Sequence, residues 1–280
     1  MWGSNVPVTR TPDAHFMTEA RYRGQKVIAI SPDYADNTKF ADEWVAPHPG
    51  TDGALGMAMG HVILKEFFVE KQTSRFTEYV KKFTDLPYLV SLREKDGAWV
   101  PDKFLVASDL GDTSEGSKFK TVVLDSANGN TYIPNGSLGH RYNDDSMGKW
   151  NLDLEGVDPL LTVYGRTDAS AAPIFLPRFD MGQKESESGG VLHRGVPTIQ
   201  IGDKKVTTVF DLMLAQYGVG REGLEGDWPT DYTDTTPYTP AWQEEITNVP
   251  AAQAIRIARE FAHTGGHRRV GRRHETPAQP

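Results

Sequence analysis

The chain carries the run Lys26-Val27-Ile28-Ala29-Ile30-Ser31 between Gly24 and Pro32. A short and nearly continuous apolar run is typical of a parallel strand that is covered on both faces. Asp33 follows at the carboxyl end of this strand. In open α/β sheets, ligands bind outside the carboxyl ends of the strands, where an acidic side chain can accept hydrogen bonds from ribose hydroxyls. Ser31, Pro32 and Asp33 are therefore candidate binding residues.

The residues before this run predict a helix from Thr11 to Arg23. Thr11 can serve as the N-cap, and the apolar side chains of Phe16, Met17 and Ala20 recur along one stripe. Helix and strand together predict one α/β unit.

The chain begins with the turn Trp2-Gly3-Ser4-Asn5-Val6-Pro7. Its glycine allows the backbone to approach an anionic ligand closely. Such a turn normally follows a β-strand, for which there is no room here, so we expect a piece of a larger cofactor enzyme. The turn and residues 31–33 should lie at neighbouring strand ends and face one crevice.

A third segment is expected at the same edge of the sheet. Residues 43–46 predict a second short strand, and residues 49–53 form a loop before a long helix. The apolar positions of this helix recur at helical spacing: Leu55, Ala58, Met59, Val62, Ile63 and Phe67. Thr51 or Asp52 can cap it, and its free backbone N–H groups can bind a phosphate or the polar edge of a nucleobase. Gly50, Thr51 and Asp52 thus complete a predicted site of three loops.

Each of these features also has an ordinary structural explanation. Gly3 could relieve a tight turn and Asp33 could cap a loop, so it is their joint order with residues 50–52 that favours a nucleotide site. His61 in the long helix and His15 in the first helix are expected to be structural. The tryptophans expected to anchor the core are Trp44, Trp99, Trp150 and Trp242.

The order of these motifs resembles the molybdopterin-dinucleotide oxidoreductases. Within that family, residues 9–15 and 32–35 are similar to the alpha subunit of the membrane-bound respiratory nitrate reductase. The other segments that carry the resemblance are 134–139, 148–152, 238–242 and 257–262.

The resemblance implies a cofactor, a reaction and partners. Such enzymes hold their metal in molybdenum bis(molybdopterin guanine dinucleotide) and reduce nitrate to nitrite. Electrons pass from quinol through a haem-containing membrane subunit and an iron–sulfur electron-transfer subunit, which would place the complex on the cytoplasmic face of the cell membrane. Relatives that act on chlorate or selenate have similar nucleotide loops, so these loops do not distinguish between the substrates. The preference for nitrate follows instead from the similarity of whole segments.

Carried over residue by residue, the resemblance implies contacts to one dinucleotide. The first loop would contact its pyrophosphate and guanosine, the second would frame the guanosine, and the third would close the nucleotide end. These cofactor-binding residues are Gly3, Ser4, Asn5, Ser31, Pro32, Asp33, Gly50, Thr51 and Asp52. Arg10 and His15 lie one turn beyond the first loop and could face the cofactor.

The chain also departs from the family pattern. It contains no cysteine, whereas the family's proximal iron–sulfur cluster is held by a Cys/His set upstream of the Trp2–Pro7 turn. The aspartate that ligates molybdenum in these enzymes also lies upstream. No metal ligand and no catalytic residue is therefore assigned, and we expect a fragment that is catalytically inert alone.

Composition limits other functions. The net charge of −8 argues against a nucleic-acid partner, and no apolar run approaches the roughly 20 residues of a membrane helix. Membrane attachment is therefore expected through another subunit. The alternative function is a stand-alone nucleotide-binding module of the NAD type, although no Gly-x-Gly-x-x-Gly sequence follows a strand.

The rest of the chain predicts an irregular region and then helices. A helix is expected at 76–83 and a hairpin around Asn128-Gly129. Residues 153–190 are rich in Gly, Pro, Ser and Asp and predict long loops. The other expected elements are strands at 89–92, 99–100, 120–124 and 131–133, and helices at 207–215, from Thr239-Pro240 and from Val249-Pro250.

The predicted fold is thus α/β, a truncated doubly wound parallel-sheet nucleotide-binding unit followed by an irregular α+β insertion with short hairpins. The nucleotide-binding unit is expected at 1–92, the insertion at 93–206, a helical return to the core at 207–262, and a disordered basic tail, which could be out of frame, at 263–280. The last helix should bury the stripe Ala254, Ile257, Ala258 and Phe261.

Overall fold

A computed structural model describes the chain as a mixed α/β structure over residues 1–71, 73–134, 154–178 and 190–266. Near the amino terminus, β1 (Ile28–Ile30) pairs in parallel with β2 (Glu43–Val45). Trp2 forms a parallel bridge with Ile30. The strands lie where the apolar runs predict them, and both are shorter than expected.

β1 is the central member of three parallel segments. The N–H of Ile30 donates to Met1 O at 2.8 Å, and the N–H of Ser31 donates to Val45 O at 3.0 Å. Successive N–H groups of a strand point to opposite sides. The Met1–Trp2 segment and β2 therefore flank β1, and all three run in the same direction.

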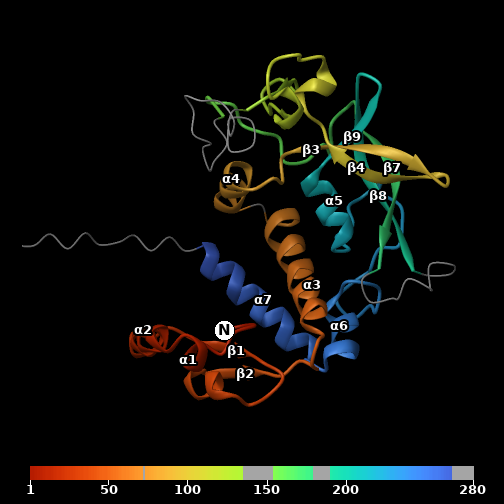
Figure 1. Cartoon of the computed structure of the whole chain (residues 1–280). Coiled ribbons are helices and arrows are strands. Elements are labelled where there is room, and N and C mark those ends of the chain that lie inside the picture. Colours follow the sequence, from red (N-terminus) through yellow and green to blue (C-terminus); the bar gives the residue numbers. More distant parts are fainter. Residues whose placement is uncertain (72, 135–153, 179–189, 267–280) are drawn as a thin grey trace, which may run out of the picture.

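Two helices connect the first segment to β1. They are α1 (Val6–Thr9) and α2 (Thr11–Tyr22), and the 3-10 turn η1 (Asp36–Phe40) then connects β1 to β2. α2 confirms the predicted helix, and its apolar stripe is not buried, since Phe16 is 65% exposed. The helix lies at the periphery, as Figure 1 shows.

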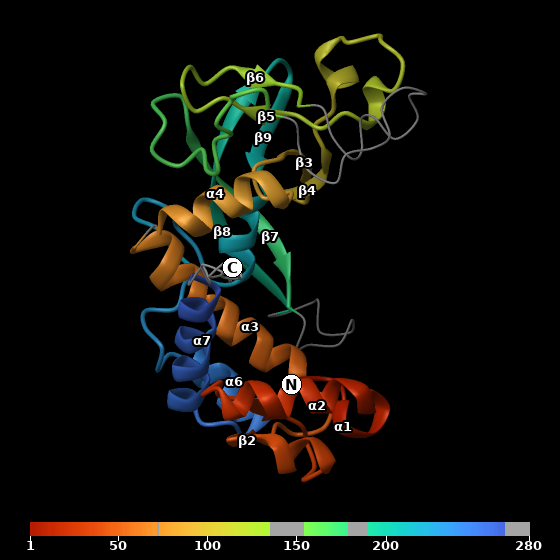
Figure 2. The same ribbon diagram turned by 90° about the vertical axis from the view of Figure 1, so that its left-hand side faces the viewer.

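The long helix α3 (Asp52–Ile63) begins at the loop after β2 and continues as the π-helical turn η2 (Leu64–Val69). It leads away from the parallel sheet toward the other half of the structure (Figure 1). α6 (Pro240–Thr247) and α7 (Ala251–Gly266) pack against it, so the two ends of the chain share one core (Figure 2). That core contains Ile30, Val45, Leu55, Met59, Val62, Val249, Ala254, Ile257 and Ala258.

The predicted stripe of α7 needs one correction. Ala254, Ile257 and Ala258 are buried, whereas Phe261 is 68% exposed and Ala262 is buried in its place. Position 262 is four residues after 258 and so lies on the same helix face. α7 also extends to Gly266, beyond the point where helical structure was expected to end.

A closed five-stranded barrel forms the other half of the structure (Figure 2). Its strands, in spatial order, are β3 (Leu89–Lys95), β4 (Ala98–Phe104), β7 (Ser170–Pro177), β8 (Val191–Ile201) and β9 (Lys204–Thr208). The pairings are antiparallel, except that β4 and β7 meet in parallel at Trp99 and Ile174.

The sequence did not predict this barrel. The expectation of long loops throughout 153–190 is wrong for β7, whose Ala172, Ile174 and Leu176 alternate into the core. Pro173 hides the pattern, and a strand tolerates it because β7 is continuously paired only with β8.

The helix expected at 207–215 is shifted. Residues 207 and 208 end β9, and α5 (Val209–Gln216) begins afterwards. The Thr208 hydroxyl caps α5 by accepting the N–H of Asp211 at 3.0 Å.

Smaller elements complete the described chain. The predicted hairpin is confirmed as β5 (Val123–Leu124) and β6 (Thr131–Tyr132), with Gly129 at a φ of 73° between them. The other short elements are α4 (Ser74–Phe83), η3 (Ala107–Leu110) and η4 (Ser117–Phe119). Among the tryptophans expected in the core, Trp242 is buried, whereas the expectation is wrong for Trp44, which is 39% exposed. Trp150 lies outside the described residues.

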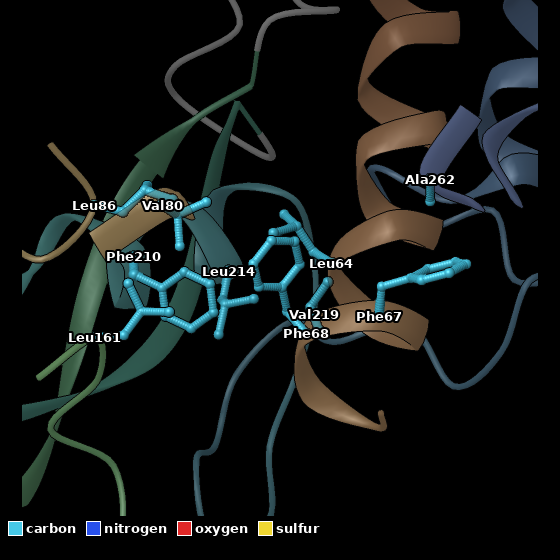
Figure 3. Close-up of a cluster of buried hydrophobic side chains, with 10 residues drawn as sticks. All are labelled: Leu64, Phe67, Phe68, Val80, Leu86, Leu161, Phe210, Leu214, Val219 and Ala262. Atoms are coloured by element: carbon cyan, nitrogen blue, oxygen red, sulfur yellow. The ribbon is translucent and has the colours of Figure 1, made fainter. Parts of the chain in front are cut away.

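An apolar cluster joins α3 and η2 to the barrel (Figure 3). Phe68 of η2 contacts Phe210 of α5, with ring centroids 5.8 Å apart. The buried members are Leu64, Phe67, Phe68, Val80, Leu86, Leu161, Phe210, Leu214, Val219 and Ala262. These contacts fix the barrel to the helices that carry the amino-terminal sheet.

Replacement of Phe210 by Ala is expected to lower the free energy of unfolding by about 3–5 kcal/mol, because it leaves a cavity in this cluster. Phe261→Ala is the matched control, since Phe261 is 68% exposed and its loss should change stability by only about 0.5 kcal/mol. Urea unfolding followed by circular dichroism measures both. Equal effects of the two substitutions would contradict this assignment of the core.

Candidate nucleotide-binding site

The three predicted loops lie side by side, each at the carboxyl end of one parallel segment. Trp2 Nε1 donates to Asp52 Oδ1 at 2.6 Å, which joins the first loop to the third. Trp44 Nε1 donates to Ser31 O at 2.9 Å, which joins β2 to the second loop. The structure therefore brings together the segments that sequence reasoning expected to meet.

The first loop contains a turn that favours glycine and a buried acceptor. Gly3 has a φ of 70°, in the left-handed region that L side chains rarely adopt. Asn5 is the N-cap of α1, and its backbone carbonyl accepts the N–H of Thr9 at 2.9 Å. Its side-chain Oδ1 is buried, and no described residue donates to it. A buried acceptor without a partner costs roughly 1–3 kcal/mol, so a donor from a ligand would be favourable here.

The second loop presents a carboxylate. Ser31 Oγ donates to Asp33 Oδ1 at 2.9 Å, and no described residue donates to Oδ2. Pro32 and Asp33 are both exposed. The Tyr34 ring packs edge-on against Trp44, with centroids 5.2 Å apart. One carboxylate oxygen is thus oriented while the other remains available to a hydroxyl or amine.

The third loop ends at the amino terminus of α3. Gly50 has a φ of 80°, and Thr51 occupies the N-cap position. Thr51 is thus the N-cap residue, as expected, but its side chain does not cap the helix: the hydroxyl donates to His48 O at 2.7 Å, and Asp52 is the first helical residue. In the described structure, the N–H groups of Asp52 and Gly53 have no acceptor. These two donors and the positive end of the helix dipole can bind an anionic or carbonyl oxygen.

A mainly apolar cavity of about 340 Å³ lies behind the third loop. Its lining residues are Gly50, Thr51, Gly53, Ala54, Met57, Tyr238, Trp242 and Ile246. Tyr238 and Trp242 form an edge-on pair with centroids 4.8 Å apart. Sequence reasoning did not assign these two aromatic residues to the site, because they lie almost 190 residues after the loop. The motif Tyr238–Trp242 was the one available signal.

His15 and His61 both lie outside these three loops. His15 is exposed and contacts Glu19 at 3.0 Å. His61 is buried, and its Nδ1 is 2.7 Å from Tyr217 O, so Nδ1 carries the proton that the carbonyl accepts. Burial lowers the pKa of His61 from 6.5 to about 4. Of the two structural positions expected for His61, packed or facing solvent, the structure shows the packed one.

Within residues 1–71, 73–134, 154–178 and 190–266, no group of three or more His, Cys, Asp or Glu side chains could hold a metal ion. No helix in that part of the chain is long and apolar enough to cross a membrane.

Comparison with known proteins identifies the class. Residues 1–254 match the sequence model of the family described as molybdopterin oxidoreductase. The chain therefore belongs to the molybdopterin oxidoreductase family, as the motifs indicated.

Within this family, the chain is similar to alpha subunits of nitrate reductases. It is 56% identical over 267 residues to the nitrate reductase alpha subunit of Mycobacterium tuberculosis, covering 94% of this chain and 21% of that protein. It is 45% identical to the nitrate reductase alpha chain of Bacillus subtilis, covering 93% and 21%. It is also 45% identical to the respiratory nitrate reductase 2 alpha chain of Escherichia coli, covering 97% and 23%. The chain thus spans about a fifth of the length of these relatives.

The buried state of His61 predicts a pH dependence of stability. The unfolded chain binds a proton at this histidine near pH 6.5, whereas the folded chain binds it only near pH 4. The contribution of His61 to the free energy of unfolding is therefore fully present above about pH 7. About 2–3 kcal/mol of it is lost as the pH falls to 4. Urea unfolding of wild type and His61→Gln at several pH values measures it.

The two proteins should diverge within this pH window, with the wild type losing more stability as the pH falls. His15→Gln is the matched control, because His15 is exposed. Parallel pH profiles of wild type and His61→Gln would refute the role given to His61.

Proposed function

We propose that the chain is part of the catalytic subunit of a molybdenum enzyme that reduces nitrate to nitrite. Support comes from family membership and from 45–56% identity to nitrate reductase alpha subunits over at least 93% of the chain. Molybdenum, when bound, supplies the oxygen-atom transfer. The role of this chain is to bind and orient the tail of the cofactor.

The proposed ligand is one arm of molybdenum bis(molybdopterin guanine dinucleotide). The Met1–Trp2 segment, β1 and β2 then represent part of a doubly wound nucleotide-binding sheet, which binds ligands at its carboxyl edge. The binding residues are Gly3, Ser4, Asn5, Ser31, Pro32, Asp33, Gly50, Thr51 and Asp52.

The residues present fit such a ligand. Guanosine offers amine, amide and hydroxyl donors, and the loops offer the acceptors Asn5 Oδ1 and Asp33 Oδ2. The N–H groups of Asp52 and Gly53 offer donors to a phosphate or a base carbonyl. The observation that carries the proposal is the meeting of these unpaired groups at the ends of three adjacent parallel segments.

The remaining parts of the enzyme belong to the proposal. Electrons reach the metal from quinol through an iron–sulfur subunit and a haem-containing membrane subunit, on the cytoplasmic face of the membrane. The molybdenum ligand and the proximal iron–sulfur cluster lie in portions of the subunit other than these 280 residues. The isolated chain therefore binds nucleotide without catalysing nitrate reduction.

Replacement of Asp33 by Ala is expected to weaken GDP binding to the chain roughly tenfold, because a charge-assisted hydrogen bond to guanosine is lost. GDP is the probe because it carries the guanosine and pyrophosphate of the dinucleotide. Asp36→Ala is the matched control, since Asp36 lies on η1 and pairs with Lys39. Isothermal titration calorimetry measures the dissociation constants, and an unchanged affinity in Asp33→Ala would remove this residue from the site.

The complete enzyme provides the test of the reaction. Purified with its partner subunits, it should contain molybdenum and should reduce nitrate with a higher kcat/KM than chlorate or selenate. The isolated chain, assayed beside it, should show no turnover. A complete enzyme without molybdenum, or one that prefers another oxyanion, would contradict the proposed activity.

A further inference from the structure

Trp2 contacts two elements of the site, β1 and α3. Its backbone bridges Ile30 of β1, and its indole Nε1 donates to Asp52 Oδ1 at 2.6 Å. The ring also lies against Gly56, where an added Cβ would stand 3.7 Å from Trp2 Cη2. Asp52 and Gly56 are four residues apart and so lie on one face of α3. The indole therefore extends along the first turn of this helix.

The hydrogen bond occupies one oxygen of the Asp52 carboxylate. No described residue donates to the other oxygen, Oδ2, and Asp52 is exposed at the start of α3. A free aspartate side chain loses rotational freedom when it binds a ligand, and this loss weakens binding. Because Trp2 already holds Oδ1, the Asp52 side chain has lost much of this rotational freedom before a ligand binds.

We propose that Trp2 is a positioning residue that orients Asp52 so that Oδ2 accepts hydrogen bonds from the base of a guanine nucleotide. Guanine carries adjacent ring N–H and amine donors, which match a carboxylate. Adenine presents a ring-nitrogen acceptor beside its amine, which a carboxylate does not match. This inference rests on the proposed function of the three loops.

The same geometry separates base recognition from phosphate binding. Trp2 acts on Asp52, whereas a pyrophosphate would use the backbone of the first loop. Loss of the indole N–H should therefore reduce the preference for guanine and leave the affinity for pyrophosphate unchanged.

Trp2→Phe tests the proposal, because phenylalanine retains a ring against Gly56 and removes only the donor. GDP, ADP and inorganic pyrophosphate are titrated into the 280-residue chain by calorimetry. Wild type should prefer GDP to ADP, and Trp2→Phe should reduce this preference roughly fivefold. Trp99→Phe is the matched control, since Trp99 lies on β4 of the barrel.

Asp52→Asn provides the second variant. The Oδ1 of asparagine can still accept from Trp2, but an amide NH2 group replaces Oδ2 and its N–H donors oppose those of guanine. The preference for GDP over ADP should therefore fall at least as far as in Trp2→Phe. The double variant Trp2→Phe/Asp52→Asn should lose no more than Asp52→Asn alone, because Trp2 acts through this carboxylate. A purely structural role of Trp2 would instead give additive losses and would weaken pyrophosphate binding as well.

The outcomes distinguish the two proposals. Wild type without a preference for GDP would overturn the nucleotide site, and this inference with it. A preference for GDP that survives Trp2→Phe would overturn the role of Trp2 alone. If Trp2→Phe does not fold, as judged by circular dichroism, the indole N–H resonance of Trp2 in the unchanged protein decides: GDP should shift it more than ADP, and equal shifts would overturn the inference.

Discussion

The site depends on the backbone pairing on both sides of β1. Ile30 donates to Met1 O and Ser31 donates to Val45 O, so β1 is held between two parallel neighbours. Parallel direction places all three carboxyl ends at one edge of the sheet. If β2 ran antiparallel to β1, residues 50–52 would lie at the opposite edge and the three loops could not share a ligand.

α3 transmits this arrangement to the rest of the structure. Its first turn carries the third loop, its middle packs on α7, and η2 reaches the cluster that joins it to the barrel (Figures 1 and 3). The core under the sheet combines Ile30 and Val45 with Val249 and Ile257, from the other end of the chain. The position of the loops therefore depends on contacts between residues more than 200 positions apart in the sequence.

The sequence predicted those features that short-range patterns determine. Apolar runs gave β1 and β2, and helical spacing gave α3 and most of α7. Contacts between distant residues were not predictable: Phe261 is exposed because Ala262 occupies the buried position, and Tyr238 and Trp242 reach the third loop only through folding. The loops of the site were predicted from their order along the chain. The hydrogen bond from Trp2 to Asp52 was not, because it joins residues 50 positions apart.

The most direct measurement of the central claim is an experimental structure of the complete enzyme with its dinucleotides bound. The account predicts one guanosine within hydrogen-bonding distance of Asn5 Oδ1, the Asp33 carboxylate and the first N–H groups of α3. A guanosine bound elsewhere, with these three loops in contact only with protein, would contradict it.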